Sequence, residues 1–200
     1  MNSIEKFKDA LLKESISYVY RKYLLGHEVW FFREKLSLDN HAVIYEDLKI
    51  YMSEQLGIHV NNIAIVGSAK LGFSLTPTDS KLFSEFSEDS DIDIVVVSPE
   101  LFKKSWSAFL ELNQKGYLPS YAAVAKNIFK HFVSLKDIDP RSDFLREWTG
   151  KIEPCKKDLQ TLFSIPHDIN YRIYDSWEDV ERYHTLGLNC IKEKIENETK

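Results

Sequence analysis

The N-terminal part of the chain carries the periodic apolar positions of amphipathic helices. Apolar residues recur at spacings of three, four and seven from Ile4 to Leu25, so we expect one helix that ends near Gly26. A second helical pattern runs from about His41 to Gly57, and a glycine at that place is typical of a helix C-terminus. The N-terminal part is therefore predicted to consist of helices.

The hydrophobic period changes in the next part, where short apolar runs indicate buried strands. Residues 63–66 are a mostly β-branched run that ends at Gly67, and residues 92–97 form a second such run. Between them, residues 73–90 are rich in Ser, Thr, Asp and Pro, which predicts a long loop or a short helix flanked by loops. Ser98 is expected to cap the helix that follows the second strand.

The second half of the chain is mostly helical in pattern, with one alternating segment. We expect several helices within residues 118–133 and 143–163, because helix breakers interrupt the pattern. These breakers are Asp139, Pro140, Gly150 and Pro154. Residues 169–174 alternate in the way typical of a half-buried strand, and Ser176 with Asp179 forms a capping-box variant before a last helix. The pattern as a whole predicts an α/β (α+β) fold, a small mixed sheet surrounded by helices.

Composition and charge narrow the class of protein. The chain has 200 residues, of which 44% are hydrophobic and 28% charged, as in an ordinary globular protein. We expect a single domain, with N-terminal helices in 1–58, a sheet core in 59–100, and helices, a late strand and a C-terminal helix in 101–200. The net charge of −5 excludes a globally basic nucleic-acid footprint. Without an apolar run of about 20 residues or the apolar core of a signal peptide, we expect a cytoplasmic protein.

The candidate chemistry lies where one predicted strand ends and the next begins. The first strand ends at Gly67 and Ser68, and the second opens with Asp91 and Asp93. Residues two apart on a strand project from the same face, so the two carboxylates stand side by side and repel each other unless a cation lies between them. Hard oxygen ligands suit Mg²⁺ or Mn²⁺, whose remaining positions water and phosphate oxygens fill. The glycine-serine turn offers backbone N–H groups and a hydroxyl to the phosphates of a nucleoside triphosphate.

This combination resembles the signature of a known enzyme family. Residues 65–68 (Ile-Val-Gly-Ser) and 90–95 (Ser-Asp-Ile-Asp-Ile-Val) look like the motifs of the polymerase beta superfamily of nucleotidyltransferases. The resemblance implies a sheet of the nucleotidyltransferase type, and two metal ions held by the paired carboxylates and a third carboxylate on a neighbouring strand. It also implies attack of an acceptor hydroxyl on the α-phosphate of a triphosphate such as ATP, with release of pyrophosphate. Looser similarities, around Trp30 and between Ile173 and His184, are to stand-alone bacterial members, several of which accompany antiphage systems.

Further positions complete the predicted site. Asp168 is our choice for the third metal ligand, and it shares one strand face with Asn170 and Arg172. Asn170 is the alternative at that position. Lys70 is predicted to bind the nucleotide together with the glycine-serine turn. The connection between Ser68 and Asp91, residues 69–90, is longer than in compact family members. This insert is therefore expected beside the site, as a lid or an acceptor-binding loop.

The expected function is that of a metal-dependent nucleotidyltransferase with Asp91, Asp93 and Asp168 as catalytic metal ligands. The identity of the acceptor is left open, and the candidates are a protein side chain, a tRNA end, a small molecule, an oligonucleotide and a second nucleotide. We favour macromolecule modification or template-free nucleotide joining in defence against phage. The alternative is a catalytically inactive nucleotide-binding or protein-interaction module, such as an antitoxin-like partner. The expected partners are the triphosphate, a nucleic-acid or protein acceptor and a partner protein of a defence or toxin-antitoxin pair, with no membrane.

Overall fold

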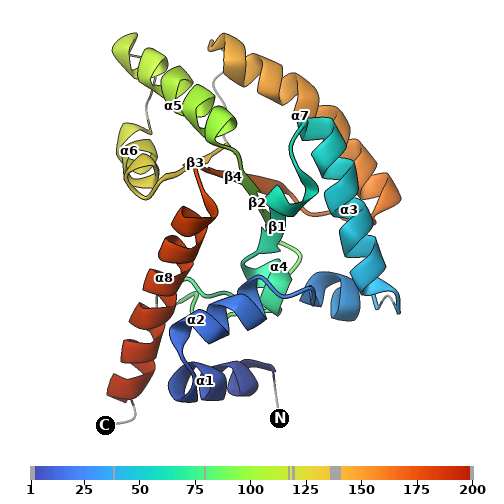
Figure 1. Cartoon of the computed structure of the whole chain (residues 1–200), viewed down its shortest axis with the longest axis vertical. Coiled ribbons are helices and arrows are strands. Elements are labelled where there is room, and N and C mark those ends of the chain that lie inside the picture. Colours follow the sequence, from blue (N-terminus) through green and yellow to red (C-terminus); the bar gives the residue numbers. More distant parts are fainter. Residues whose placement is uncertain are drawn as a thin grey trace.

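The computed structural model describes residues 3–37, 39–78, 80–116, 118, 120–135 and 141–198, which form one sheet surrounded by helices (Figure 1). The strands lie in the order β1-β2-β4-β3. Their bounds are Ile63–Val66 for β1, Ile92–Val97 for β2, Phe132–Ser134 for β3 and Ile169–Tyr174 for β4. The pairs β1–β2 and β3–β4 are antiparallel and the central pair β2–β4 is parallel. The predicted mixed sheet of an α+β fold is thus confirmed.

Helices flank the sheet on both faces. In Figure 1, α3 and α7 run side by side along one side of the sheet, and α8 lies on the other side. The α-helices are α1 Ser3–Lys13, α2 Ile16–Val19, α3 His41–Leu56, α4 Ser68–Leu71, α5 Pro99–Gln114, α6 Tyr121–Phe129, α7 Asp143–Leu162 and α8 Trp177–Glu198. Two π-helical segments, η1 Tyr20–Leu24 and η2 Phe31–Lys35, and a 3-10 turn, η3 Val60–Asn62, lie between them.

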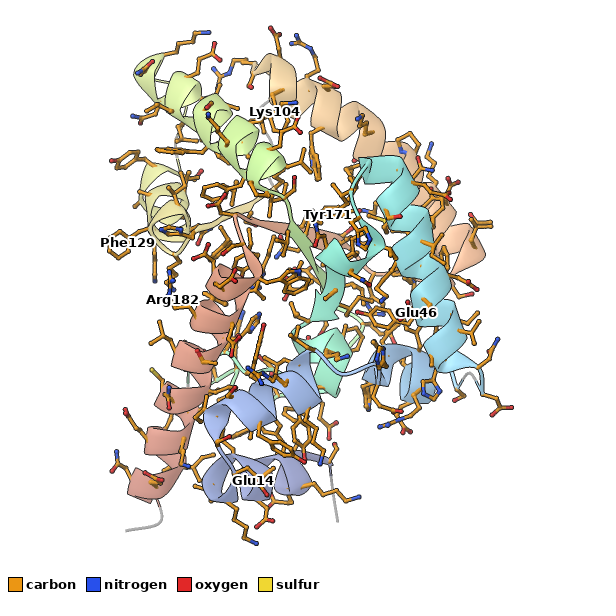
Figure 2. All side chains as sticks on the ribbon, in the orientation of Figure 1. Glu14, Glu46, Lys104, Phe129, Tyr171 and Arg182 are labelled. Carbon is orange, nitrogen blue, oxygen red and sulfur yellow. The ribbon has the colours of Figure 1, made fainter. Side chains whose placement is uncertain are left out.

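The two faces of the sheet pack against different helices, because side chains alternate along each strand. Ile92 and Ile94 of β2 enter the largest core cluster, which α3, α5 and α7 complete. Tyr171 of β4, labelled in Figure 2, enters the same cluster and packs edge-on against Trp148 of α7, with 5.6 Å between ring centroids. The opposite face forms a smaller cluster with the start of α8. Asp93 alternates with Ile92 and Ile94, so it lies on this second face.

Several predicted helix ends are confirmed by their capping interactions. Gly57 ends α3 in the left-handed conformation at φ 66°. The Ser98 hydroxyl accepts a hydrogen bond from the backbone N–H of Leu101 at 3.2 Å and so caps α5. Before α8, the Ser176 hydroxyl donates to the Asp179 carboxylate at 2.7 Å and accepts from the Asp179 backbone N–H at 3.1 Å, which is the predicted capping-box variant.

The prediction of one continuous N-terminal helix up to Gly26 is wrong. The α-helix stops at Lys13, and Ser15 begins a new one, because its hydroxyl accepts a hydrogen bond from the backbone N–H of Tyr18 at 3.2 Å. The chain then continues as the π-helical segment η1. The break keeps Phe7 and Leu11 on one side of a cluster whose other side is η1 and α8. The apolar spacing survives the break, which is why the period alone does not reveal it.

The second half differs from its prediction in two ways. Phe132 and Val133, expected to be helical, belong to the strand β3, whose short ladder against β4 supplies its backbone hydrogen bonds. In α7 the helix continues through Gly150 and Pro154, although breakers there were expected to divide it. Its buried face, which includes Trp148 and Leu159, offsets the roughly 3 kcal/mol that an internal proline costs. Asp139 and Pro140 lie outside the described residues.

The insert between β1 and β2 is an ordered loop after the short helix α4. An isolated bridge joins Phe73 to Glu85, and Phe86 is buried against Phe31 and the His167 ring. The described residues of 73–90, all but Asp79, thus form the predicted long loop, and part of this loop belongs to the core. In the part of the chain that the structure describes, no helix has the length and apolarity needed to cross a membrane.

Candidate functional site

The glycine-serine turn lies directly against the second carboxylate of the Asp-x-Asp pair. Gly67 follows β1 at φ 72° and ψ −150°, a backbone conformation that residues with a side chain rarely adopt. A Cβ atom at Gly67 would lie 2.7 Å from Asp93 Oδ2, which is closer than such atoms approach. Glycine is therefore required here twice, by the turn and by the neighbouring carboxylate, and it brings Ser68 to the edge of the site.

Asp93 is held by two side chains of the parallel strand β4. It stands opposite Asn170 in the β2–β4 register. Asn170 Nδ2 donates a hydrogen bond to Asp93 Oδ1 at 2.8 Å, and Arg172 Nη2 donates to Asp93 Oδ2 at 3.0 Å. The side chains of Asp93 and Arg172 are only 18% and 22% exposed, so this is a largely buried ion pair. The negative charge of Asp93 is therefore compensated by the chain itself.

The electrostatics of Arg172 follow from this pairing. Burial, the largest single effect, lowers the pKa of Arg172, because it penalises the charged form, but the Asp93 carboxylate together with Tyr183 and Tyr174 more than offsets it. The pKa of Arg172 therefore lies above its usual value. The guanidinium is a fixed positive charge beside the site.

Asp91 and Asp168 directly precede the two central strands, β2 and β4. The backbone N–H of Ile92 donates to the Asp168 carbonyl at 2.8 Å, so the two strands stay together up to this point. The register pairs Ile92 with Ile169, and extended by one residue it places Asp91 beside Asp168. Asp168 precedes β4, its side chain is 64% exposed, and its carboxylate pairs with Lys156 at 2.5 Å. Asn170, the alternative for the third position, is the residue that faces Asp93.

Lys70 is not brought to this site. Its side chain is buried, its amino group donates to the Gly26 carbonyl, and the same group lies 5.5 Å from the centre of the Tyr45 ring. Tyr45 in turn accepts a hydrogen bond from the Ile65 N–H at the outer edge of β1. Lys70 therefore lies on the side of β1 that faces away from Asp93. Burial, the larger effect, lowers the pKa of Lys70 to about 8, and Lys49 adds to it.

His184, the histidine of the last helix, is packed among aromatic side chains. Its ring stacks on Tyr20 with 6.1 Å between centroids, and its Nε2 is buried without a hydrogen-bond partner among the described residues. Burial, followed by the charge of Arg172, lowers the pKa of His184 to about 3. The imidazole is therefore neutral at ordinary pH.

Sequence reasoning assigned no role to Arg172, although it placed that residue on the right face. The signal that could have found it is the run Asn-x-Arg in a half-buried strand, where a charged residue on a sheltered face needs a partner. The partner, Asp93, lies 79 positions away in the sequence, and only the strand order shows that the two meet.

Asp91, Asp93 and Asp168, the three expected metal ligands, do not bring their ligand atoms within 4.8 Å of one another. Asp93 lies on β2 and Asp91 directly precedes that strand, and Mg²⁺ typically takes one or two carboxylates and fills its other positions with water and phosphate. On β4, an uncharged amide faces Asp93, because Asn170 donates to it through Nδ2 and accepts from the Ser134 hydroxyl at 3.0 Å through Oδ1.

Among the described residues, one group of three side chains has the geometry to hold a metal ion, and it lies elsewhere. In the described residues, His131, Asp175 and Asp179 bring ligand atoms within 4.8 Å of one another. This group lies at the far end of β4 from Asn170. No family model matches the chain, and neither a curated protein nor a solved structure is significantly similar to it.

Proposed function

We propose that the chain is a metal-dependent nucleotidyltransferase, which transfers a nucleoside monophosphate from a nucleoside triphosphate to an acceptor hydroxyl. The single observation that carries this proposal is the packing of the Gly67 turn on Asp93, the second acid of the Asp-x-Asp pair. A turn that presents backbone N–H groups next to paired carboxylates combines a phosphate site with a cation site. Transfer of a nucleotidyl group needs both at the same place.

The roles of the residues follow from their positions. Asp91 and Asp93 would hold one Mg²⁺ or Mn²⁺ ion, which neutralises phosphate charge and lowers the pKa of a bound hydroxyl when it is present. The Ser68 hydroxyl and the turn backbone would bind phosphate oxygens. Arg172 supplies a positive charge on the same face and, as a planar donor with several N–H groups, can bind phosphate oxygens as well as Asp93.

The acceptor class is part of the same proposal. We favour a macromolecule, a nucleic-acid end or a protein side chain, or template-free joining of nucleotides, with a role in defence against phage and a partner protein of such a system. Mass spectrometry of the purified chain and of nucleic acid that copurifies with it identifies the acceptor without a prior choice. An added nucleoside monophosphate on either one is the expected product.

The direct test is transfer of label from each α-labelled triphosphate in the presence of Mg²⁺ or Mn²⁺ and candidate acceptors. Asp91→Asn and Asp93→Asn should each reduce transfer by several orders of magnitude, since each removes a charged metal ligand. Asp47→Asn is the matched control, because Asp47 is exposed on α3, which packs on the face of the sheet opposite Asp93. Equal transfer by Asp93→Asn and by the control contradicts the proposal.

A second function, a nucleotide-binding or protein-interaction module without catalysis, is favoured by one specific observation. Arg172 and Asn170 already satisfy both oxygens of Asp93. A guanidinium in that place reduces the attraction of the site for a divalent cation. Calorimetry with a triphosphate separates the two functions. Binding that is equally tight with and without Mg²⁺, together with unchanged biological activity of Asp91→Ala, supports the module.

A further inference from the structure

Three potential metal ligands meet where β3, β4 and α8 come together. His131 directly precedes β3, Asp175 directly follows β4, and Asp179 lies in the first turn of α8. The β3–β4 register pairs Phe132 with Tyr174, so its extension by one residue sets His131 opposite Asp175. Asp179 follows closely, because only Asp175 and Ser176 separate the end of β4 from the start of α8. The convergence thus results from the sheet register and the helix start together.

The geometry of the group suits a small cation. One ligand atom from each of the three side chains lies within 4.8 Å of the other two. His131 Nδ1 is 3.5 Å from Asp179 Oδ1, a separation of two ligands that share an ion rather than of a good hydrogen bond. Asp179 is buried, with a side chain only 7% exposed, whereas the His131 side chain is 53% exposed. The group therefore has one sheltered carboxylate and an open side towards solvent.

A positive charge already lies at this group. Arg182 Nη1 donates to Asp179 Oδ1 at 3.0 Å, and the Ser176 hydroxyl holds the other oxygen. The Arg182 side chain is 63% exposed and projects from α8, where Figure 2 labels it. Because Asp179 is buried, loss of this pair without a replacement would leave its charge uncompensated. A divalent ion at the group would take the place of the guanidinium as the compensating charge, and the Ser176 hydrogen bond can remain.

We propose that His131, Asp175 and Asp179 form a binding site for one divalent transition-metal ion, with Zn²⁺ as the best fit. An imidazole nitrogen with two carboxylate oxygens is a ligand set that zinc accepts, whereas Mg²⁺ and Ca²⁺ prefer sites made of oxygen alone. Three protein ligands leave the fourth tetrahedral position to water. The ion ties β3 and β4 to the start of α8.

This site is distinct from the one at Asp93. Asn170 and Asp175 lie five residues apart along β4, or about 16 Å at the rise of a strand. The two sites therefore do not share a cation, and the zinc site does not depend on the nucleotidyltransferase proposal.

The test is calorimetric titration of the purified, metal-free chain with Zn²⁺. We expect one ion per chain and a loss of at least tenfold in affinity in both His131→Asn and Asp175→Asn. Asparagine suits position 131 because His131 has a positive φ of 58°, a conformation that asparagine tolerates and that keeps the backbone intact. Asp47→Asn and Cys190→Ser are the matched controls, which remove an exposed carboxylate of α3 and the exposed thiol, and both should bind as the unaltered chain does.

Thermal unfolding gives a second readout. At free Zn²⁺ a hundred times the dissociation constant, the melting temperature should rise by about 5 to 10 °C in the unaltered chain and not in His131→Asn. The proposal is overturned by absence of Zn²⁺ binding at micromolar concentration, or by binding that His131→Asn and Asp175→Asn leave unchanged. Binding that is lost in Asp47→Asn or Cys190→Ser instead, or Mg²⁺ binding of equal affinity that His131→Asn abolishes, overturns it as well.

Discussion

Asp93→Asn tests the ion pair between the two central strands, and we expect it to destabilise the fold as well as to reduce activity. The new amide oxygen can still accept the hydrogen bond of Asn170, so the loss is confined to the charge that faces Arg172. Both partners are mostly buried, and a hydrogen bond between charged groups contributes about 1.5 to 3 kcal/mol. We therefore expect a loss of about 2 kcal/mol, which corresponds to a fall in melting temperature of about 4 to 8 °C.

Relief of repulsion between Asp91 and Asp93 acts in the opposite direction but is smaller. Side chains two residues apart on a strand are about 7 Å apart, where two charges repel by about 2.4 kcal/mol at an effective dielectric constant of about 20, whereas two opposite charges about 4 Å apart attract by about 4 kcal/mol. From the sequence alone, this relief would make Asp93→Asn stabilising in the absence of metal. Arg172 reverses the expected sign of this change in stability. An unpaired, largely buried guanidinium destabilises the fold by more than the repulsion between Asp91 and Asp93 does.

A double-mutant cycle isolates the pair. The free energy of unfolding is measured by denaturant titration, without metal, for Asp93→Asn, Arg172→Gln and the double variant. The double variant should be more stable than the sum of the single effects predicts, by about 1 to 2 kcal/mol. Additivity within about 0.5 kcal/mol, or an increase in stability of Asp93→Asn alone, would refute the reasoning about the pair.

Three other predictions concern the turn and two buried titratable groups. Gly67→Ala should lower stability by about 2 kcal/mol or more and weaken triphosphate binding, measured by calorimetry. The reasons are that the added Cβ would clash with Asp93 and that Gly67 has a positive φ; unchanged stability and affinity would contradict this. The pKa of Lys70 is lowered to about 8, so above that pH only the unfolded chain still binds the proton, and stability should rise from pH 8 to 9.5 relative to Lys70→Met. The same pH slope in both proteins would argue against a buried Lys70. The pKa of His184 is lowered to about 3, so between pH 6.5 and pH 4 the unfolded chain binds a proton at His184 and the folded chain does not. Stability should therefore fall over this pH range in the unaltered chain relative to His184→Phe. Melting temperatures that change with pH in the same way in both proteins would contradict the burial of His184.

The elements predicted well are those whose signal lies within a few residues. The strands β1, β2 and β4 have compact apolar or alternating runs, and α3 ends at a glycine stop. Their bounds follow from burial of a face and from local capping, which a single sequence displays. The α+β class follows from their order.

The elements missed depend on contacts between distant segments. The strand β3 has three residues and exists because β4 offers it an edge to pair with. In α7, burial of one face outweighs the breaking effect of Pro154, and that burial is not visible in the sequence. The candidate site divides in the same way. The spacing of Asp91 and Asp93 is local, whereas the meeting of Asp93 with Arg172, and the place of Lys70 beyond the outer edge of β1, are set by strand order and packing.

The central claim is that Asp91 and Asp93 support metal-dependent nucleotidyl transfer, and release of pyrophosphate measures it most directly. The assay compares the unaltered chain, Asp93→Asn and Asp47→Asn, with Mg²⁺, with Mn²⁺ and with chelator, on preparations whose folded fraction is known from thermal unfolding. We predict release that requires the metal, persists in Asp47→Asn and falls by several orders of magnitude per folded molecule in Asp93→Asn. Release that is equal in all three proteins, or that is unaffected by chelator, would contradict the account.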